Sequence, residues 1–313
     1  MRTTMAAMTQ ASFLDGLANT SDLDALLIAG PTASGKSAFA LEAAKRTGGV
    51  VINADSMQLY DGLRILTARP SVEEEAQAEH YLYGCVDPRV AFSTGDYTRA
   101  IAPLLQRFAD EKRFVIIVGG TGLYFNALTT GLVDIPDLAP DIMGKVEAMQ
   151  AGGEDLHQWL QLHDPASATK LSPLDFPRLQ RAAAVKMATG RSLSAWQQET
   201  TAPMIAAGRW RGVFLAPERD ALYARINTRF VSMLENGALD EVRAVQALNL
   251  SANRGVMKAH GMPHLLAFLR GEISRDDAVR LGQQDTRNYA KRQFTWARRF
   301  MADWQWIDPA QLS

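Results

Sequence analysis

The sequence has one cysteine, no long apolar run and almost no net charge. Its one cysteine, Cys85, excludes disulfide scaffolds, zinc ribbons and iron–sulfur clusters, and fits a reducing compartment. No run approaches the roughly 20 apolar residues that span a bilayer, so we expect a cytoplasmic protein without a membrane anchor. The formal net charge is −1, so any nucleic-acid site must be a local patch.

Residues 1–24 contain one basic residue, Arg2, and no continuous apolar segment. This is not the pattern of a signal peptide, and we expect a flexible leader. Hydrophobic residues make up 47% of the 313 residues and charged residues 21%, which is enough to build a buried core. We expect a monomer.

Short apolar runs at 25–29, 50–53, 114–118 and 210–215 alternate with helical patterns such as 37–46 and 97–110. This alternation predicts an α/β fold in which helices flank a parallel sheet. Longer helical patterns cover 222–248 and 275–299, and 304–307 could add a strand. Pro136 and Pro140 mark a boundary, after which the chain looks purely helical. We therefore predict a core of residues 25–133 and 204–313, interrupted by an all-helical domain at 134–203.

Residues 30–37 match the phosphate-loop motif at every fixed position and lie between a predicted strand and a predicted helix. The two glycines let several backbone N–H groups face one anion, and the helix N-terminus adds its positive end. The lysine supplies a mobile charge, and the final hydroxyl can ligate Mg²⁺. The segment therefore predicts a P-loop NTPase-like core that binds a di- or triphosphate through Gly30, Pro31, Thr32, Ala33, Ser34, Gly35, Lys36 and Ser37.

The expected carboxylate follows another strand. Strand 114–118 ends in Gly-Gly-Thr-Gly, where an ATP-hydrolysing enzyme usually has an acidic residue for Mg²⁺. Asp55, after strand 50–53, should lie near the phosphate loop as a metal ligand, a general base or only a helix cap. The residues alone leave open a small-molecule kinase and a reaction in which diphosphate is the leaving group.

Residues 286–300 have five basic residues and no acidic residue. Helical spacing places Arg287, Lys291 and Arg298 on one face, which favours contact with RNA phosphates but also fits an ordinary solvated face. A non-enzymatic, nucleotide-gated RNA-binding protein is thus a third possibility. A weaker basic cluster, Arg178, Arg181 and Lys186, lies in the predicted insertion, and the five histidines show no convincing metal-binding spacing.

Five segments, taken in order, together resemble the bacterial tRNA dimethylallyltransferase family, also called the tRNA isopentenyltransferase or IPP transferase family. They are residues 30–37, Asn-Ala-Asp-Ser-Met-Gln-Leu-Tyr at 53–60, Val-Gly-Gly-Thr-Gly-Leu-Tyr at 118–124, Leu-Tyr-Ala-Arg-Ile-Asn at 222–227, and Tyr-Ala-Lys-Arg-Gln-Phe-Thr-Trp at 289–296. The resemblance implies transfer of a dimethylallyl group from dimethylallyl diphosphate to N6 of the adenosine 3′ of the anticodon. It implies Mg²⁺ as cofactor, release of diphosphate, and tRNAs that read codons beginning with U.

The resemblance also implies roles for individual residues. Asp55 corresponds to the catalytic base, Arg225 to a diphosphate contact, and Thr121 to a residue at the mouth of the channel where the substrates meet. Ser37 would contact Mg²⁺, directly or indirectly. The implied tRNA contacts are Asp55, Ser56, Met57, Gln58, Thr121, Pro177, Arg178, Leu179, Gln180, Arg181, Lys291, Arg292, Gln293, Trp296 and Arg298. The chain departs from the family pattern at Leu66, Met143, Ala184 and Met262.

Overall fold

The computed structural model describes residues 14, 16, 22–133, 135, 138–199, 201–252 and 254–311. Most of the predicted leader lies outside these residues. The chain divides into two units, residues 1–129 with 205–313, and residues 130–204. The predicted insertion, 134–203, falls inside the second unit, and each unit is considered by itself.

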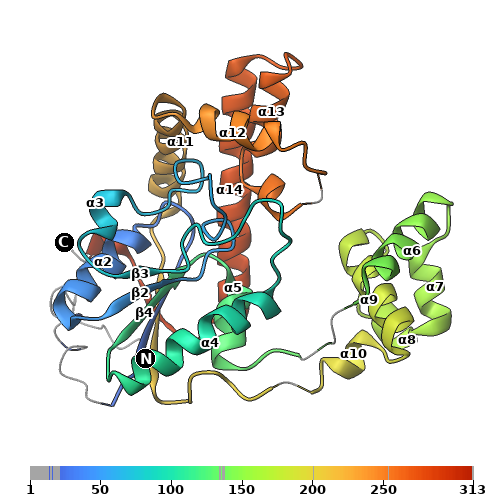
Figure 1. Cartoon of the computed structure of the whole chain (residues 1–313), viewed down its shortest axis with the longest axis horizontal. Coiled ribbons are helices and arrows are strands. Elements are labelled where there is room, and N and C mark those ends of the chain that lie inside the picture. The colour runs from blue at the N-terminus through green and yellow to red at the C-terminus, as the bar shows by residue number, and fades with distance from the viewer. Residues whose placement is uncertain are drawn as a thin grey trace. The chain divides into compact units, whose positions relative to one another are not determined.

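A six-stranded parallel sheet forms the centre of the first unit (Figure 1). The strand order is β3-β2-β4-β1-β5-β6, and the predicted α/β class is confirmed. Strand β3 was not predicted because it is only two residues long and half-buried. The strands are β1 (Ala25–Ala29), β2 (Val50–Asn53), β3 (His80–Tyr81), β4 (Val115–Gly119), β5 (Trp210–Leu215) and β6 (Gln305–Ile307).

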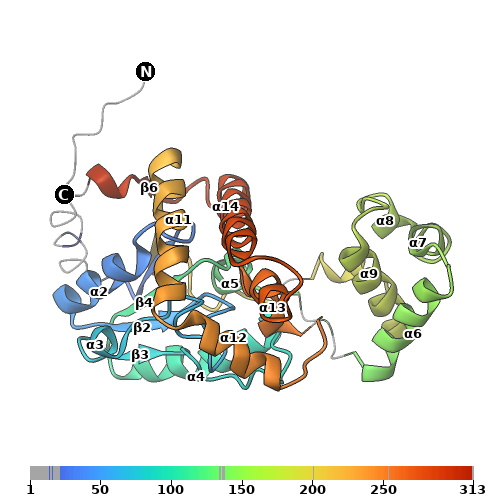
Figure 2. The same cartoon turned by 90° about the horizontal axis from the view of Figure 1, so that it is seen from above.

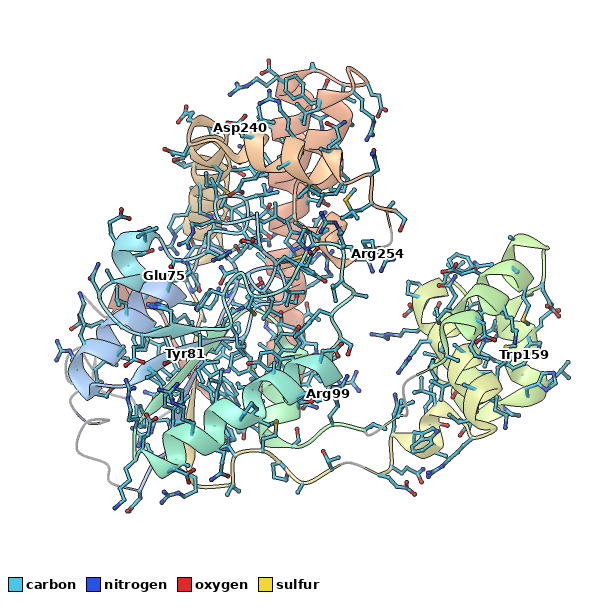
Figure 3. The ribbon with its side chains drawn as sticks, in the orientation of Figure 1. Glu75, Tyr81, Arg99, Trp159, Asp240 and Arg254 are labelled. Carbon is cyan, nitrogen blue, oxygen red and sulfur yellow. The ribbon has the colours of Figure 1, made fainter. Side chains whose placement is uncertain are left out.

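Helices pack around this sheet (Figures 1 and 2). Helix α2 buries Phe39, Ala40 and Ala43 against Leu26 and Ile28 of β1. At the sheet edge lies Tyr81, which is labelled in Figure 3. Its ring is 5.2 Å from that of Phe108 in α4. The helices of this unit are α2 (Lys36–Thr47), α3 (Val72–Glu75), α4 (Thr94–Asp110), α5 (Gly122–Thr129), α11 (Arg219–Glu235), α12 (Ala238–Ala247), α13 (Met262–Leu269) and α14 (Arg275–Phe300), with short 3-10 helices at Gly255–Lys258 and Pro309–Gln311.

The prediction of one helical segment at 222–248 is wrong in one respect. Two helices, α11 and α12, occupy this range, and the chain breaks between them at Gly237, whose φ of 102° is left-handed. An uninterrupted helix cannot include such a residue, so the apolar pattern continues across a real turn. Helix α14 packs against both α11 and α13.

The second unit is all-helical and has its own core (Figure 1). Val146, Leu160, Leu179 and Ala184 are buried together there. Ala184, one of the departures from the family pattern, is fully buried in this core. The helices are α6 (Pro140–Ala151), α7 (Leu156–His163), α8 (Pro165–Ala168), α9 (Phe176–Thr189) and α10 (Leu193–Trp196).

The sheet topology brings the motifs of the first unit together. Strands β2, β4 and β1 are consecutive neighbours, so the segments that follow their carboxyl ends meet at one edge of the sheet. Those segments carry the phosphate loop, Asp55 and Thr121. Ligands of open α/β sheets bind at this edge. Within the described ranges, no helix is both long and apolar enough to cross a membrane.

Candidate active site

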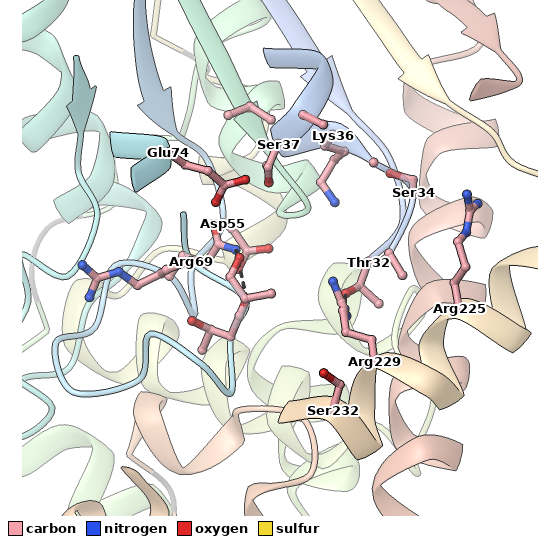
Figure 4. Close-up of a pocket in the computed structure, with 18 of the residues that line it drawn as sticks. Thr32, Ser34, Lys36, Ser37, Asp55, Arg69, Glu74, Arg225, Arg229 and Ser232 are labelled. Atoms are coloured by element: carbon pink, nitrogen blue, oxygen red, sulfur yellow. Dashed lines mark hydrogen bonds between the residues drawn. The ribbon is translucent and has the colours of Figure 1, made fainter. Parts of the chain in front are cut away.

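The phosphate loop and Asp55 line one cavity of about 760 Å³. Lys36 extends into it from one side, and the carboxylates of Asp55 and Glu74 face it from the other (Figure 4). Helix α11 supplies a third wall with Arg225 and Arg229. The cavity therefore has cations at the phosphate loop and carboxylates opposite, as binding an anion beside a general base requires.

Lys36 is held beneath the loop, where its Nζ donates a hydrogen bond of 2.9 Å to the carbonyl oxygen of Pro31. Desolvation lowers the pKa of Lys36 to about 8; the negative charge of Asp55 opposes this shift and the positive charge of Arg229 adds to it. Burial disfavours the charged ammonium group, so a phosphate oxygen with its negative charge would stabilise it more than the backbone carbonyl does.

Arg229 is a site residue that was only a weak candidate from the sequence, beside Arg225 on the same helix. Its guanidinium donates to the hydroxyl of Thr32 in the phosphate loop, and burial lowers its pKa while the charge of Asp55 opposes that shift. Arg225, the predicted diphosphate contact, also lines the cavity. The two arginines are four residues apart, so they share a helix face; that spacing was the signal available in the sequence.

Asp55 is fixed by the side chain of Asn53, which is fully buried. The Oδ1 of Asn53 accepts from the Asp55 N–H (2.8 Å), and its Nδ2 donates to the carbonyl oxygens of Asp55 and Leu82 (2.9 Å each). The Oδ1 of Asp55 accepts from the Met57 N–H at 3.0 Å. Turns, not a helix, follow Asp55, so the helix-cap interpretation is wrong.

Thr121 braces the same loop. Its Oγ1 accepts from the Ser56 N–H at 2.9 Å and lies 3.2 Å from the Ser56 hydroxyl, while its own N–H donates to Ala54 (3.1 Å). Gln58 is likewise engaged, because its Nε2 donates to the carbonyl oxygens of Thr67 and Ala68. The predicted residues 55–58 and 121 thus form one hydrogen-bonded wall beside the cavity.

A small cavity adjoins the first, and a third cavity adjoins the small one. One of about 50 Å³ shares Thr32, Asp55 and Arg229 with the large cavity. Another of about 240 Å³ is lined by Thr121, Gln293 and Trp296, and it shares Tyr289 with the small one. Spaces therefore lie on both sides of Asp55, one toward the phosphate loop and one toward α14.

Helix α14 presents only part of the predicted basic face, because Arg287 is half-buried and donates to the side chains of Asn227 and Gln284. Lys291, Arg292 and Arg298 are exposed, whereas Trp296 is only half-exposed and its ring lies 4.6 Å from that of Phe300. Gln293 was expected to contact RNA, but it is only 8% exposed. Both the oxygen and the nitrogen of its side-chain amide are hydrogen-bonded inside the protein.

Residues 177–181 lie on α9 of the second unit. Pro177, Arg178 and Arg181 are exposed there, and Arg178 pairs with Asp175 at 3.4 Å. Gln180 hydrogen-bonds to Gln150 at 2.7 Å. Leu179 was expected among the RNA contacts but is buried in the core of its unit, so the structure gives it a packing role.

Comparisons with known proteins agree with this arrangement. The sequence profile of the family described as IPP transferase matches residues 58–300. A tRNA dimethylallyltransferase of Bradyrhizobium sp. (strain ORS 278) is 50% identical over 291 residues, covering 92% of this chain and 94% of the relative.

Solved structures give the same result. The tRNA isopentenylpyrophosphate transferase of Bacillus halodurans matches with a TM-score of 0.66 and 32% identity, covering 91% of this chain and 89% of that one. A eukaryotic dimethylallyltransferase acting on tRNA matches with a TM-score of 0.79 and 25% identity, covering 91% and 74%. With its phosphate loop, Asp55 and Thr121 at one edge of a parallel sheet, the chain belongs to the IPP transferase family.

Proposed function

We propose that this chain is a tRNA dimethylallyltransferase. It transfers a dimethylallyl group from dimethylallyl diphosphate to N6 of the adenosine 3′ of the anticodon, in tRNAs that read codons beginning with U. The relatives that carry this name are about half identical to the chain over nearly its whole length. The observation that carries the proposal is the single cavity shared by the phosphate loop and Asp55.

The phosphate loop binds the diphosphate of the donor. Backbone N–H groups where the phosphate loop enters the N-terminus of α2 face the anion, with Lys36 as a point charge and Arg225 and Arg229 on the wall formed by α11. Charge builds up on the leaving diphosphate as its bond to carbon breaks. Cations fixed in place before the reaction stabilise that charge without reorganisation.

Asp55 acts as the general base. The N6 lone pair attacks C1 of the dimethylallyl group, the C1–O bond breaks, and its electron pair leaves with the diphosphate. The amine is a poor nucleophile because its lone pair is delocalised into the purine ring. Asp55 takes the proton that N6 loses, and Asn53 and Thr121 keep the Asp55 loop in place for this transfer.

Transfer to a stacked base requires that base to leave its stack, at a cost of a few kcal/mol. We propose that the exposed side chains of α14 (Lys291, Arg292 and Arg298) and of the helical unit (Arg178 and Arg181) bind the anticodon arm. Ser56 and Met57, on the turn next to Asp55, then meet the extruded adenosine. Single-stranded loops are recognised by stacking and by base-edge hydrogen bonds, so a neutral protein can bind RNA through such local surfaces.

We propose Mg²⁺ as the cofactor. The Ser37 hydroxyl and the carboxylate of Glu74 line the same cavity as the phosphate loop, and they are the oxygen ligands that Mg²⁺ prefers, usually one or two together with substrate phosphates. When bound, Mg²⁺ neutralises part of the diphosphate charge. One chain supplies every group named here, and we propose that the enzyme acts as a cytoplasmic monomer.

The test is to incubate the protein with unmodified tRNA, Mg²⁺ and either dimethylallyl diphosphate or ATP, and to analyse the nucleosides by mass spectrometry. We expect adenosine to gain one dimethylallyl group with the first donor, and no phosphorylated product with ATP. If folded protein gives no alkylated adenosine, the proposal is wrong. ATP turnover with a small-molecule acceptor would favour the kinase alternative.

A further inference from the structure

Gln293 lies on the basic helix but faces inward and joins two loops of the active site. Its Oε1 accepts from the Thr32 N–H of the phosphate loop at 2.9 Å. Its Nε2 donates to the carbonyl oxygen of Gly120, in the segment that carries Thr121, at 3.0 Å. One side chain therefore connects α14, the phosphate loop and the wall beside Asp55.

The groups around the Gln293 amide are packed so closely that the side chain has little room to move. A Cβ added to Gly120 would lie 2.3 Å from Nε2 of Gln293 and 3.0 Å from Oδ2 of Asp55, so the amide and the carboxylate flank the same glycine. Thr32 is held from a second side as well, because its hydroxyl accepts from Arg229 of α11. The position of Thr32 thus depends on two helices at once.

The same helix carries the exposed cations Lys291, Arg292 and Arg298. They precede and follow Gln293 within about two turns, and a helix moves as a stiff unit over that distance. If RNA binds the outer face, it restricts this helix and, through the hydrogen bonds of Gln293, the phosphate loop. A loop that is already ordered costs less entropy to order when a diphosphate arrives.

We propose that Gln293 couples the RNA-facing surface of α14 to the phosphate loop, so that bound RNA tightens the binding of diphosphate and the reverse. This rests on the proposed function, since it takes α14 as an RNA surface. Coupling of this kind is reciprocal and commonly amounts to about 5- to 150-fold in affinity.

The experiment measures binding of inorganic diphosphate, in the presence of Mg²⁺, by titration calorimetry with and without an anticodon stem-loop RNA. It compares the wild type, Gln293→Ala and the matched control Gln283→Ala. Gln283 is on the same helix, and its Nε2 donates to the carbonyl oxygen of Asn227 at 3.1 Å, so its loss removes a similar bond that does not reach the phosphate loop.

We expect RNA to tighten diphosphate binding by about tenfold in the wild type and in Gln283→Ala. In Gln293→Ala, we expect the gain to fall below about twofold. Gln293→Met, which keeps the length of the side chain and removes both hydrogen-bonding groups, should behave like Gln293→Ala and serves if the alanine variant does not fold.

The inference is overturned if RNA leaves the diphosphate affinity of the wild type unchanged or weaker. It is also overturned if RNA tightens diphosphate binding as much in a folded Gln293 variant as in Gln283→Ala. Alkylation of tRNA by the wild type is measured in parallel. Absence of the product would contradict the proposed function, whereas a normal product without coupling would contradict only the role of Gln293.

Discussion

Lys36 gives diphosphate binding a pH dependence. Its pKa is lowered to about 8, so the side chain is charged below that pH and becomes neutral above it. A bound anion favours the charged form of Lys36 and raises this pKa. The affinity for dimethylallyl diphosphate should therefore change little with pH near pH 7. Above pH 8 it should fall by up to tenfold per pH unit. Lys36→Met should bind weakly, with little pH dependence, in calorimetric titrations from pH 7 to 9.5. A fall in affinity of the same slope in Lys36→Met would assign it to another group.

Arg229 should matter more for binding of the donor than Arg219, an arginine of the same helix that does not line the cavity. Arg229→Ala removes a half-buried cation and its hydrogen bond to Thr32, and loss of a charged hydrogen bond costs about 1.5–3 kcal/mol, or roughly 10- to 150-fold in affinity. Arg219→Ala is the control, since Arg219 lies on the same helix over the ring of Tyr223. Diphosphate binding measured by calorimetry should weaken only in the first variant. Equal affinities in the two variants would remove Arg229 from the site.

At the scale of elements, α14 should make RNA binding salt-dependent through a few defined contacts. Each phosphate contact removed should lower the slope of log affinity against log salt by about 0.7–0.9. We expect this for Lys291→Ala and Arg298→Ala, with diphosphate binding little changed. Arg280→Ala is the matched control, because Arg280 is exposed on the same helix and pairs with Asp277 at 3.0 Å. Filter-binding titrations at several salt concentrations measure the slopes, and unchanged slopes would mean that this face is only solvated.

The elements predicted from sequence were those with a strong local signal. Strands β1 and β4 are continuous apolar runs, and α14 has a long amphipathic pattern that ends within one residue of its predicted limit. Helices α3, α5 and α13 and strand β3 were not predicted, because they are short and depend on tertiary packing. The break at Gly237 was missed because apolar residues keep a helical spacing on both sides of it.

The site was predicted where a motif fixes the chemistry and missed where folding creates it. The phosphate loop and Asp55 could be placed together because both follow strands of one parallel sheet. Arg229, Asn53 and Gln293 act through hydrogen bonds to partners 2 to 261 residues away. The local pattern does not report the distant partners of Arg229 and Gln293. Gln293 was expected to contact RNA because it lies in a segment of the family resemblance.

At the scale of the whole molecule, the helical unit should be removable without loss of the α/β unit. The chain segments that lead into and out of it are adjacent, since the Ile205 N–H donates to the Leu128 carbonyl oxygen at 3.1 Å and the Thr201 N–H to that of Leu132 at 2.9 Å.

Replacing residues 133–200 by a short Gly-Ser linker should preserve diphosphate binding within about twofold. RNA affinity should fall by about tenfold or more, because a linked second surface is lost. Circular dichroism and calorimetry would check both, and loss of diphosphate binding in a folded variant would contradict independence of the units.

The central claim is that Asp55 removes the N6 proton while the phosphate loop holds the departing diphosphate. Its most direct test is the single-turnover rate of dimethylallyl transfer to tRNA by the wild type, Asp55→Asn and the exposed control Asp61→Asn, each saturated with both substrates. We predict that Asp55→Asn lowers the rate by about 10²- to 10⁴-fold while tRNA and diphosphate affinities stay near those of the wild type, and that Asp61→Asn reacts normally. A transfer rate in Asp55→Asn close to that of the wild type would contradict the account.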